Sequence, residues 1–402
     1  MIPLNICIIS QEFPPHTNWG GIAAYYSGLA DIFCKLGHDV TIVSRSENGA
    51  PKFEILPSGV KVWRVGRPIK RKYFIGRTID RIIHAFDVER KVKELDAQKR
   101  FDVIEAAEAS FESERLLKNE NFRLRIVIQC HGSNFQGVVP DSPLAFLHKL
   151  DWKWSFAREK NSIELAQHIL VMSEATRNFL HVHGLDIYKT HLIHHGIDTC
   201  RFSPVGEFSS AWLEVGFAGR IEKRKGIDFI WKVMDQIGPD AGIRFHFKGA
   251  VHRSLESEFK EAMHRFKNFS IYHGAGSAAD MPNYYRKLHV LLQPSRFETF
   301  GLVYVEAMAS GLIVMAGIGG GGSEIIEHGR TGYLVDPDGR SAPTAARLRE
   351  IADNLPGFKS LRENARKEVQ QRFSLETCAQ LKIAYYKDQV IQHSHACPIL
   401  NK

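Results

Sequence analysis

The sequence predicts an α/β protein made of two consecutive doubly wound domains, each of roughly 200 residues. Three observations lead to this prediction. The chain has 402 residues, more than a single domain usually contains. Strand-like and helix-like patterns alternate along nearly all of it, which is typical of parallel sheets covered by helices. The alternation weakens over residues 198–212, DTCRFSPVGEFSSAW, and then begins again, so this segment is the predicted linker.

The first domain is expected to begin with a strand, a glycine loop, a helix and a second strand. Residues 4–10 are a short apolar run, followed by a polar loop that ends in two glycines. Residues 22–36 carry apolar side chains three and four positions apart, which predicts an amphipathic helix, and Gly37 is suited to end it. The next strand is predicted at 39–44. Further strands are expected at 60–65, 101–105, 125–130, 166–173 and 189–194, with a long helix at 142–164.

A second series of strands follows the linker. Short apolar runs, most of them separated by helical stretches, predict strands at 213–219, 243–249, 269–274, 290–294, 312–316 and 332–335. Two doubly wound sheets fit this pattern better than one very large sheet.

The composition excludes several classes of protein. Hydrophobic residues make up 44% and charged residues 24%, which argues against a disordered or fibrous chain. No apolar run approaches the roughly 18–20 residues that span a bilayer, and the N-terminus lacks the pattern of a signal peptide. The six cysteines are scattered without a zinc or disulfide spacing, so we expect a cytoplasmic protein.

The charge is +8 and is unevenly distributed, which favours anionic partners. Residues 61–81 contain eight basic residues and one acid, interleaved with aromatic and aliphatic side chains. This stretch is interpreted either as a solvated face or as a docking patch for an anionic surface, such as the inner face of a membrane or an acceptor.

The densest group of candidate functional residues lies between 296 and 339. Phe300 and Gly301 form a predicted turn into a helix over 302–309, which Gly311 ends. The N-terminus of a helix offers unpaired N–H groups and the positive end of a dipole. This end of the helix therefore predicts a site for phosphate oxygens.

Two glutamates, Glu298 and Glu306, stand eight positions apart around this turn. On a single helix they would lie about 12 Å apart, at about 1.5 Å per residue. The acid and base of a glycoside hydrolase lie about 5–9.5 Å apart, so the spacing argues against a hydrolase. It favours two carboxylates that bind hydroxyl groups on different parts of an elongated ligand.

Two glycine-containing segments accompany the helix. The tract GIGGGG at 317–322 follows a predicted strand and indicates either a flexible turn or a close approach of the backbone to a ligand. The segment GFAGRIEKRKG at 216–226 places Arg220 and Lys225 after another strand, where two cations would bind a diphosphate by charge. A solvent-exposed basic loop is the alternative for this segment.

With these residues in view, the sequence resembles the retaining glycosyltransferases of family 4, the glycosyl transferases group 1, over nearly the whole chain. The strongest element is the pair Glu298 and Glu306 within ETFGLVYVEAMASG. The run from Gly219-Arg220 to Lys225-Gly226 supports it. Further similar elements are Gly20-Gly21, His131-Gly132, and His195-Gly196-Ile197-Asp198 ahead of Phe202 and Pro204.

The resemblance implies the GT-B fold, in which two doubly wound Rossmann-like domains face each other across a cleft. Residues 1–205 would form the N-terminal domain, on the acceptor side. Residues 206–374 would form the C-terminal domain, which binds the nucleotide sugar. Residues 375–402 would form a C-terminal helix that crosses back to the N-terminal domain.

The resemblance also implies roles for individual residues. Arg220 and Lys225 would neutralise the donor diphosphate, Glu306 would bind the ribose hydroxyls, and Glu298 would contact the transferred sugar. The expected catalytic residues are Glu298, Arg220, Lys225 and His131, the last beside the sugar. The other expected donor contacts are the backbone N–H groups near Phe300, Gly301 and Leu302, and the first helix, which Gly20 and Gly21 allow to approach the diphosphate.

Neither a metal nor a cofactor is expected. A metal-dependent transferase would place an acid–x–acid pair at a strand end, and the candidate Asp336-Pro337-Asp338 falls in a predicted turn. Arg220, Lys225 and helix dipoles already supply positive charge. The expected small molecule is the substrate itself, a UDP- or GDP-sugar.

The predicted function is therefore transfer of a sugar from a nucleotide sugar to a hydroxyl of a saccharide, a lipid-linked or another acceptor. The resemblance implies retention of configuration by a front-face route. An epimerase or another non-transferase enzyme of the same fold is the alternative. A nucleic-acid-binding protein is suggested by charge alone, and since no basic-aromatic recognition module accompanies the charge, nucleic acid is not an expected partner.

Overall fold

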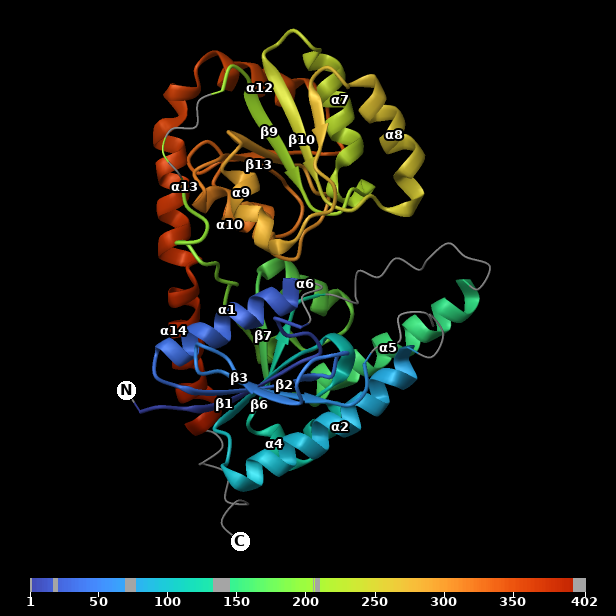
Figure 1. Cartoon of the computed structure of the whole chain (residues 1–402), viewed down its shortest axis with the longest axis vertical. Coiled ribbons are helices and arrows are strands. Elements are labelled where there is room, and N and C mark those ends of the chain that lie inside the picture. Colours follow the sequence, from blue (N-terminus) through green and yellow to red (C-terminus); the bar gives the residue numbers. More distant parts are fainter. Residues whose placement is uncertain are drawn as a thin grey trace. The chain divides into compact units, whose positions relative to one another are not determined.

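The computed structural model describes residues 2–16, 21–68, 77–132, 145–204, 206 and 210–392. Contacts between residues divide the chain into two units. Unit 1 comprises Met1–His194 together with Cys378–Lys402, and unit 2 comprises His195–Thr377. Each unit contains one sheet with helices on both of its faces (Figure 1).

The sheet of unit 1 has eight strands within the described residues, in the order β3-β4-β2-β1-β5-β6-β7-β8. Neighbouring strands are parallel except at the β3 edge, where β3 runs antiparallel to β4. The strands are β1 (Asn5–Ser10), β2 (Asp39–Arg45), β3 (Phe53–Ile55), β4 (Lys61–Val65), β5 (Val103–Ala107), β6 (Ile126–Cys130), β7 (His168–Val171) and β8 (Thr190–Leu192).

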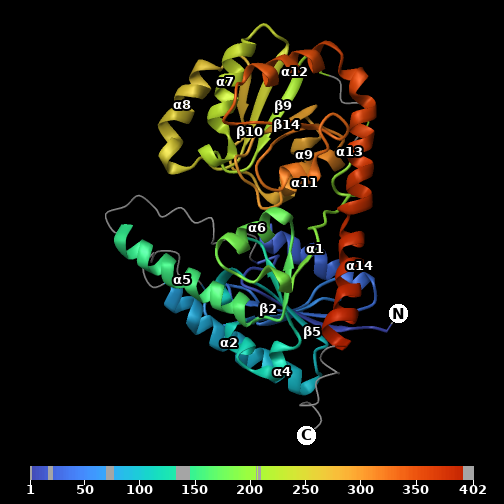
Figure 2. The ribbon, with the colours of Figure 1, turned by 180° about the vertical axis from the view of Figure 1, so that it is seen from behind.

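Within the described residues, the part of unit 1 that precedes residue 195 contains six α-helices. They are α1 (Gly21–Lys35), α2 (Arg77–Gln98), α3 (Glu114–Leu117), α4 (Glu120–Arg123), α5 (Ala145–Leu165) and α6 (Glu174–Val182). Helices α2 and α5 lie side by side (Figure 2), and the Arg81 guanidinium on α2 donates to the Ser155 hydroxyl on α5 at 2.8 Å. Strand β3 and helix α2 are two elements of this unit that the sequence pattern did not predict.

The sheet of unit 2 has six parallel strands within the described residues, in the order β11-β10-β9-β12-β13-β14. The strand order reverses beside β9, as in a doubly wound sheet. The strands are β9 (Leu213–Ala218), β10 (Ile243–Lys248), β11 (Ser270–Tyr272), β12 (Val290–Gln293), β13 (Ile313–Gly317) and β14 (Tyr333–Val335).

The helices of unit 2 follow its strands. They are α7 (Ile227–Ile237), α8 (Glu256–Arg265), α9 (Met281–Tyr285), α10 (Leu302–Ala309), α11 (Gly322–Ile325), α12 (Ala342–Asp353) and α13 (Lys359–Arg372). Helix α14 (Leu375–Tyr385) begins with the last residues of unit 2 and continues into the part of the chain that belongs to unit 1, where the π-helical segment η7 (Tyr386–Ile391) follows.

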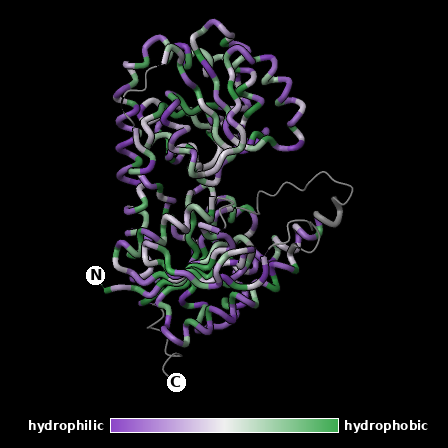
Figure 3. Tube along the Cα trace, in the orientation of Figure 1, coloured by the Kyte–Doolittle hydropathy of each residue, from purple (hydrophilic) through white to green (hydrophobic). Residues whose placement is uncertain are grey.

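The apolar residues explain why each sheet is buried. The strands are mainly hydrophobic, whereas the outer faces of the helices are hydrophilic (Figure 3). In unit 2, Phe245 and Phe247 on β10 are buried in one cluster with Phe259 on α8. Burial of one such side chain contributes about 1.5–3 kcal/mol, so packing against helices holds the sheet in place.

Unit 2 is closed by a contact between its first and last residues. Ile197 N donates to Phe373 O at 2.9 Å, and Leu375 N donates to Ile197 O at 2.9 Å. Gly196 has no room for a side chain, because a Cβ there would lie 2.7 Å from the Ser374 carbonyl oxygen. This pairing explains why the chain from residue 195 onward groups with unit 2.

A search of the described helices for one with the length and apolarity needed to cross a membrane finds none.

Candidate functional site

The loop between β12 and α10 shapes the carboxyl edge of the unit 2 sheet. Gly301 stands at the N-cap of α10 with φ +100°, a conformation that side-chain-bearing residues rarely adopt. A Cβ at this position would also lie 2.3 Å from the Tyr304 ring. Helix α10 then runs over Leu302–Ala309 and Gly311 follows with φ +81°, which matches the predicted helix and its end.

The glycine tract at 317–322 packs against this loop along its backbone. A Cβ at Gly319, Gly320 or Gly321 would lie 1.8, 2.1 or 2.2 Å from the carbonyl oxygens of Arg296, Glu298 and Phe300. Gly321 N also donates to Glu298 O at 2.9 Å. Contact between the two loops therefore accounts for these glycines, and neither a flexible turn nor a ligand is needed to explain them.

Lys225 and Glu298 form a close ion pair next to this loop. Lys225 Nζ lies 2.5 Å from Glu298 Oε1, and the two side chains are only 16% and 9% exposed. Ser295 Oγ donates to the same carboxylate oxygen at 2.9 Å. The sequence placed Lys225 at a diphosphate and Glu298 at a sugar, and the structure brings these two residues together.

Arg220 follows strand β9 and extends towards solvent. Its side chain is 64% exposed, and its nearest carboxylate is that of Glu222, at 3.7 Å. Glu222 pairs more closely with Arg224, at 2.8 Å. Arg220 is thus the more exposed of the two cations predicted for the site.

Glu306 lies within α10, whereas Glu298 precedes that helix, so the 12 Å estimate for a shared helix does not apply. Tyr285 Oη donates to Glu306 Oε2 at 2.9 Å. Burial raises the pKa of the Glu306 carboxyl from 4.5 to about 7, against smaller lowering effects of the Tyr285 hydroxyl and the charge of Arg201. The carboxyl therefore changes its charge near neutral pH.

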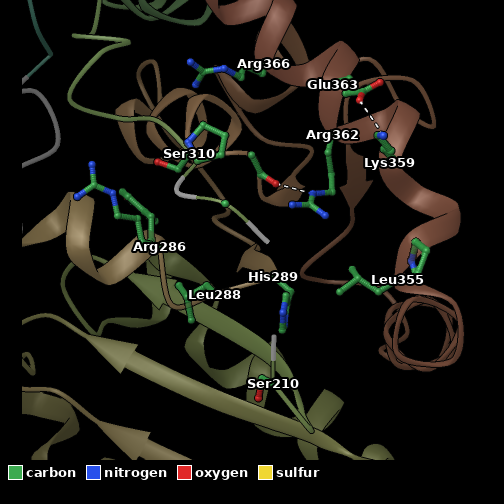
Figure 4. Close-up of a pocket in the computed structure, with 15 residues that line it drawn as sticks. Ser210, Arg286, Leu288, His289, Ser310, Leu355, Lys359, Arg362, Glu363 and Arg366 are labelled. Carbon is green, nitrogen blue, oxygen red and sulfur yellow. Dashed lines mark hydrogen bonds and ion pairs between the residues drawn. The ribbon is translucent and has the colours of Figure 1, made fainter. Parts of the chain in front are cut away.

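A separate cavity of about 520 Å³ opens in unit 2 near the other end of α10 (Figure 4). Arg362 on α13 points into it, and its Nε donates to Gly311 O at 2.7 Å. Of the described donor residues predicted from the sequence, none lines this cavity. Tyr285 does line it, so this one side chain contacts both the cavity and the carboxylate of Glu306.

In unit 1, His131 follows strand β6 and is 8% exposed. Its ring packs edge-on against the rings of Tyr25 and Tyr26 on α1, with centroids 5.4 and 5.5 Å away. Burial, with a smaller effect of the charge of Lys382, lowers the pKa of His131 from 6.5 to about 3. The imidazole is therefore neutral near pH 7.

Of the two N-terminal glycines, Gly21 lies within the described residues. Gly21 is the first residue of α1, and a Cβ there would meet no atom within 4 Å. Gly20 lies outside the described residues.

The structure adds Glu108 to the site of unit 1. Glu108 is completely buried, and its Oε1 accepts hydrogen bonds from the backbone N–H groups of His131 and Gly132, at 2.8 and 2.6 Å. The sequence signal for it is the segment EAAEASFESE at 105–114, in which one glutamate lies in a buried strand and three follow it. Because a charged residue is usually exposed, such a signal does not by itself indicate a site.

The basic stretch at 61–81 is partly used within unit 1. Lys61 pairs with Asp39 at 2.8 Å, Arg64 pairs with Glu54 at 2.5 Å, and Arg81 is buried against Ser155. Residues 69–76 lie outside the described part of the chain. These pairs reduce the number of cations that the stretch offers to an external surface.

The acidic pair Asp336 and Asp338 after β14 lies in a turn. Asp338 N donates to Asp336 Oδ1 at 3.0 Å, and the Asp338 carboxylate accepts from Arg296 Nε at 2.8 Å. Across the described ranges of the chain, no group of three or more His, Cys, Asp or Glu side chains is arranged to hold a metal ion.

Comparisons with known proteins agree with this architecture. Residues 19–201 match the family model for glycosyltransferase family 4, and residues 210–368 match the model for glycosyl transferases group 1. An uncharacterised glycosyltransferase of Methanocaldococcus jannaschii is 25% identical over 96% of this chain and 98% of its own. A D-inositol 3-phosphate glycosyltransferase of Arthrobacter is 26% identical over 97% and 95%.

Among solved structures, the sucrose-phosphate synthase of Thermosynechococcus elongatus superposes with a TM-score of 0.78. It is 21% identical and covers 98% of this chain and 100% of its own, so it shares the fold. Two Rossmann-like units, two glycosyltransferase family models and these relatives together establish that the chain is a glycosyltransferase with the GT-B fold.

Proposed function

We propose that this glycosyltransferase moves a sugar from a nucleoside diphosphate sugar to a hydroxyl of a saccharide or lipid-linked acceptor, with retention of configuration and without a metal ion. A UDP- or GDP-sugar is the donor that the family resemblance favours. The supporting observation is the carboxyl edge of the unit 2 sheet, where an exposed Arg220, the Lys225–Glu298 pair and the N-terminus of α10 follow strands β9 and β12.

The diphosphate would bind at this edge by charge and by helix N–H groups. Arg220 and Lys225 are permanent cations that follow β9, and Gly301 and Leu302 begin α10 after β12. Because N–H groups of a helix N-terminus are unpaired, they complement the charge that develops on a departing diphosphate. Lys225 also holds Glu298, so one ammonium group would serve both the phosphate and the carboxylate next to the sugar.

The two glutamates would bind different parts of the donor. Glu306, in its ionised form, would accept hydrogen bonds from the ribose hydroxyls, and Glu298 would contact the transferred sugar. His131, which is neutral near pH 7, would donate or accept a hydrogen bond beside the sugar without carrying a charge. A neutral imidazole there suits binding rather than proton release at neutral pH.

Retention follows from a front-face transfer. The bond from the anomeric carbon to the diphosphate oxygen breaks, and the acceptor oxygen forms its bond on the same face. The acceptor hydroxyl passes its proton to the departing diphosphate. No carboxylate attacks the sugar in this route, which agrees with a Glu298 whose oxygen is already bonded by Lys225 and Ser295.

The basic residues of the 61–81 stretch other than Lys61, Arg64 and Arg81 would contribute to contact with the acceptor, or with the inner face of the membrane from the cytoplasm. Sedimentation with vesicles that contain anionic lipid tests it, and equal recovery with neutral vesicles would remove membrane contact from the proposal.

The donor is tested first by thermal shift with UDP, GDP and ADP, followed by transfer assays with the sugar nucleotides of the best ligand. A double variant, Arg220→Ala with Lys225→Ala, should lose the shift. Lys260→Ala, an exposed lysine on α8, is the matched control and should keep it. If no nucleoside diphosphate shifts the melting temperature of the unsubstituted chain, the proposed donor is wrong.

Metal independence is tested by chelation. With excess EDTA the turnover should stay within about twofold of the untreated rate, because the cations at β9 and the α10 dipole supply the positive charge. A collapse in turnover that magnesium or manganese restores would overturn the metal-free route.

A further inference from the structure

The segment from β5 to α3 contains four buried glutamates, and three of them have charged or ionisable partners. Glu105 lies 2.7 Å from Lys382 Nζ, Glu112 lies 2.7 Å from His84 Nε2, and Glu114 lies 2.6 Å from Arg158 Nε. Glu108 differs in what it binds, because its Oε1 accepts two consecutive backbone N–H groups, those of His131 and Gly132.

Two consecutive N–H groups that point at one anion form a concave site, and here a side chain of the same unit fills it. Gly132, whose N–H is the second donor, has φ +72°, a left-handed conformation that glycine adopts readily. Glu108 itself is fixed, since its backbone N–H donates to Gln129 O at 3.2 Å and its side chain has no exposed surface.

These contacts fix the position of the His131 ring. Glu108 holds the backbone of His131, and Tyr25 and Tyr26 pack against its ring. Two hydrogen bonds from consecutive amides to one carboxylate oxygen hold the turn at a single point. Loss of the carboxylate would therefore free the turn while leaving the aromatic contacts of the ring.

We propose that Glu108 is a positioning residue for sugar transfer, which holds the turn at His131 and Gly132 so that the imidazole meets the transferred sugar. The inference rests on the proposed role of His131. Glu108 would not touch the substrate, and its effect on the reaction would pass through His131.

The turn is tested without substrate by hydrogen exchange of the amides over 126–132. In Glu108→Ala the amides of His131 and Gly132 should lose protection, whereas Glu108→Gln, whose side-chain oxygen still accepts, should keep part of it. Glu112→Ala is the matched control, a buried glutamate of the same segment paired with His84, and it should leave these two amides protected. Unchanged protection in Glu108→Ala would overturn the inference.

The reaction is tested by a double-mutant cycle with His131. We expect Glu108→Ala to lower kcat about 10- to 100-fold with little change in KM for the donor. Glu108→Gln should retain most of the normal kcat. In a His131→Ala background the same substitution should change kcat less than twofold, because its effect passes through the ring. Equal losses in both backgrounds, or an equal loss in Glu112→Ala, would show a merely structural role.

The two proposals fail in different ways. If the unsubstituted chain transferred no sugar from any nucleotide donor, the proposed function would be wrong, and hydrogen exchange would still decide whether Glu108 holds the turn. If the chain transferred sugar and His131→Ala had normal kcat, the role of Glu108 in transfer would be wrong while the proposed function stood.

Discussion

At the scale of single residues, the main result is that charges of the candidate site pair with one another. Lys225 and Glu298 are 2.5 Å apart and largely buried, so neither acts independently. Removal of one partner leaves a buried charge without compensation. The resulting loss of stability exceeds the net contribution of the pair to the free energy of folding. Roles assigned to the two residues one at a time must therefore be tested together.

Lys225→Ala should lower kcat/KM about 10²- to 10³-fold, since it removes a cation from the proposed diphosphate site. Combined with Glu298→Gln, the loss should be smaller than the product of the two single losses, because the residues share one interaction. Steady-state kinetics on the three variants measure this. Lys223→Ala, an exposed neighbour paired with Glu258 at 3.6 Å, is the control and should stay within twofold. Independent, multiplicative losses would contradict a functional pair.

Glu306 should make nucleotide binding depend on pH. Its pKa of about 7 lies above the ordinary 4.5, so below pH 7 the carboxyl of the folded chain carries a proton. In the proposed role this proton must leave before the carboxylate can accept hydrogen bonds from ribose hydroxyls. Affinity for the nucleoside diphosphate should therefore fall as pH decreases from 8 to 6. By the same sign, the folded state binds more protons than the unfolded one between pH 4.5 and 7, so Glu306 makes stability decrease as pH rises through that range.

Calorimetry with Glu306→Gln provides the control, since this variant keeps the titration of the nucleotide itself and loses that of the carboxyl. Its affinity should be lower at pH 8, and its dependence on pH shallower than that of the unsubstituted chain. Glu298→Gln should bind the bare nucleotide almost normally and turn over more slowly. Equal losses of affinity in both variants would mean that the two roles are wrong.

At the scale of elements, the site depends on two loops that run against each other. The chain from 295 to 300 and the tract from 317 to 322 approach so closely that three glycine positions are filled by carbonyl oxygens of the opposite loop. The helix that presents its N-terminus, α10, follows directly. Its position is therefore set by backbone packing between β12 and β13, and the glycines are part of the scaffold of the site.

Gly320→Ala should destabilise the chain and weaken nucleotide binding together. At φ +72° a side chain costs about 1–2 kcal/mol, and here the new Cβ would also lie 2.1 Å from Glu298 O, which forces the loop to move. Gly329→Ala is the matched control, with φ +79° and no atom within 4 Å of its Cβ. Melting and nucleotide titration should show the larger loss in Gly320→Ala, and binding should stay normal in Gly329→Ala. Equal effects would mean that the loop contact is unimportant.

At the scale of the whole molecule, the sequence predicted what depends on local patterns. The strands of both sheets carry apolar runs, and the bounds of α10 follow from a glycine before it and one after it. Helix α2 was missed because charged residues are spread along its whole length and interrupt the apolar positions. The short β3 was missed because it is a half-exposed edge. Neither gives a periodic apolar signal strong enough to detect.

The buried charges escaped prediction for another reason. Glu105, Glu108 and Lys382 are completely buried, although single residues of these types are nearly always exposed. What buries them is a partner far away in sequence: Lys382 and Glu105 are 277 positions apart. Local composition carries no information on such a pair, so roles for these residues become visible only when the sheet brings them together.

The long-range pair of Lys382 and Glu105 connects helix α14 to strand β5 of the unit 1 sheet. Lys382 Nζ lies 2.7 Å from Glu105 Oε1 and 2.8 Å from Gln129 Oε1, on neighbouring strands β5 and β6, and the Tyr386 hydroxyl also donates to Glu105. Lys382→Met should lower the free energy of unfolding by about 3–5 kcal/mol, because it leaves Glu105 buried without its cation.

Adding Glu105→Gln should recover part of this loss, since the uncompensated charge is then gone, whereas Glu105→Gln alone should also destabilise the chain. Lys387→Met, a partly exposed lysine of the following π-helical segment, should change stability by less than about 0.5 kcal/mol. Urea unfolding of the four variants measures these differences. If Lys382→Met unfolded like Lys387→Met, the C-terminal segment would be packed on unit 1 by apolar contacts alone, and the buried pair would have no part in holding the chain end in place.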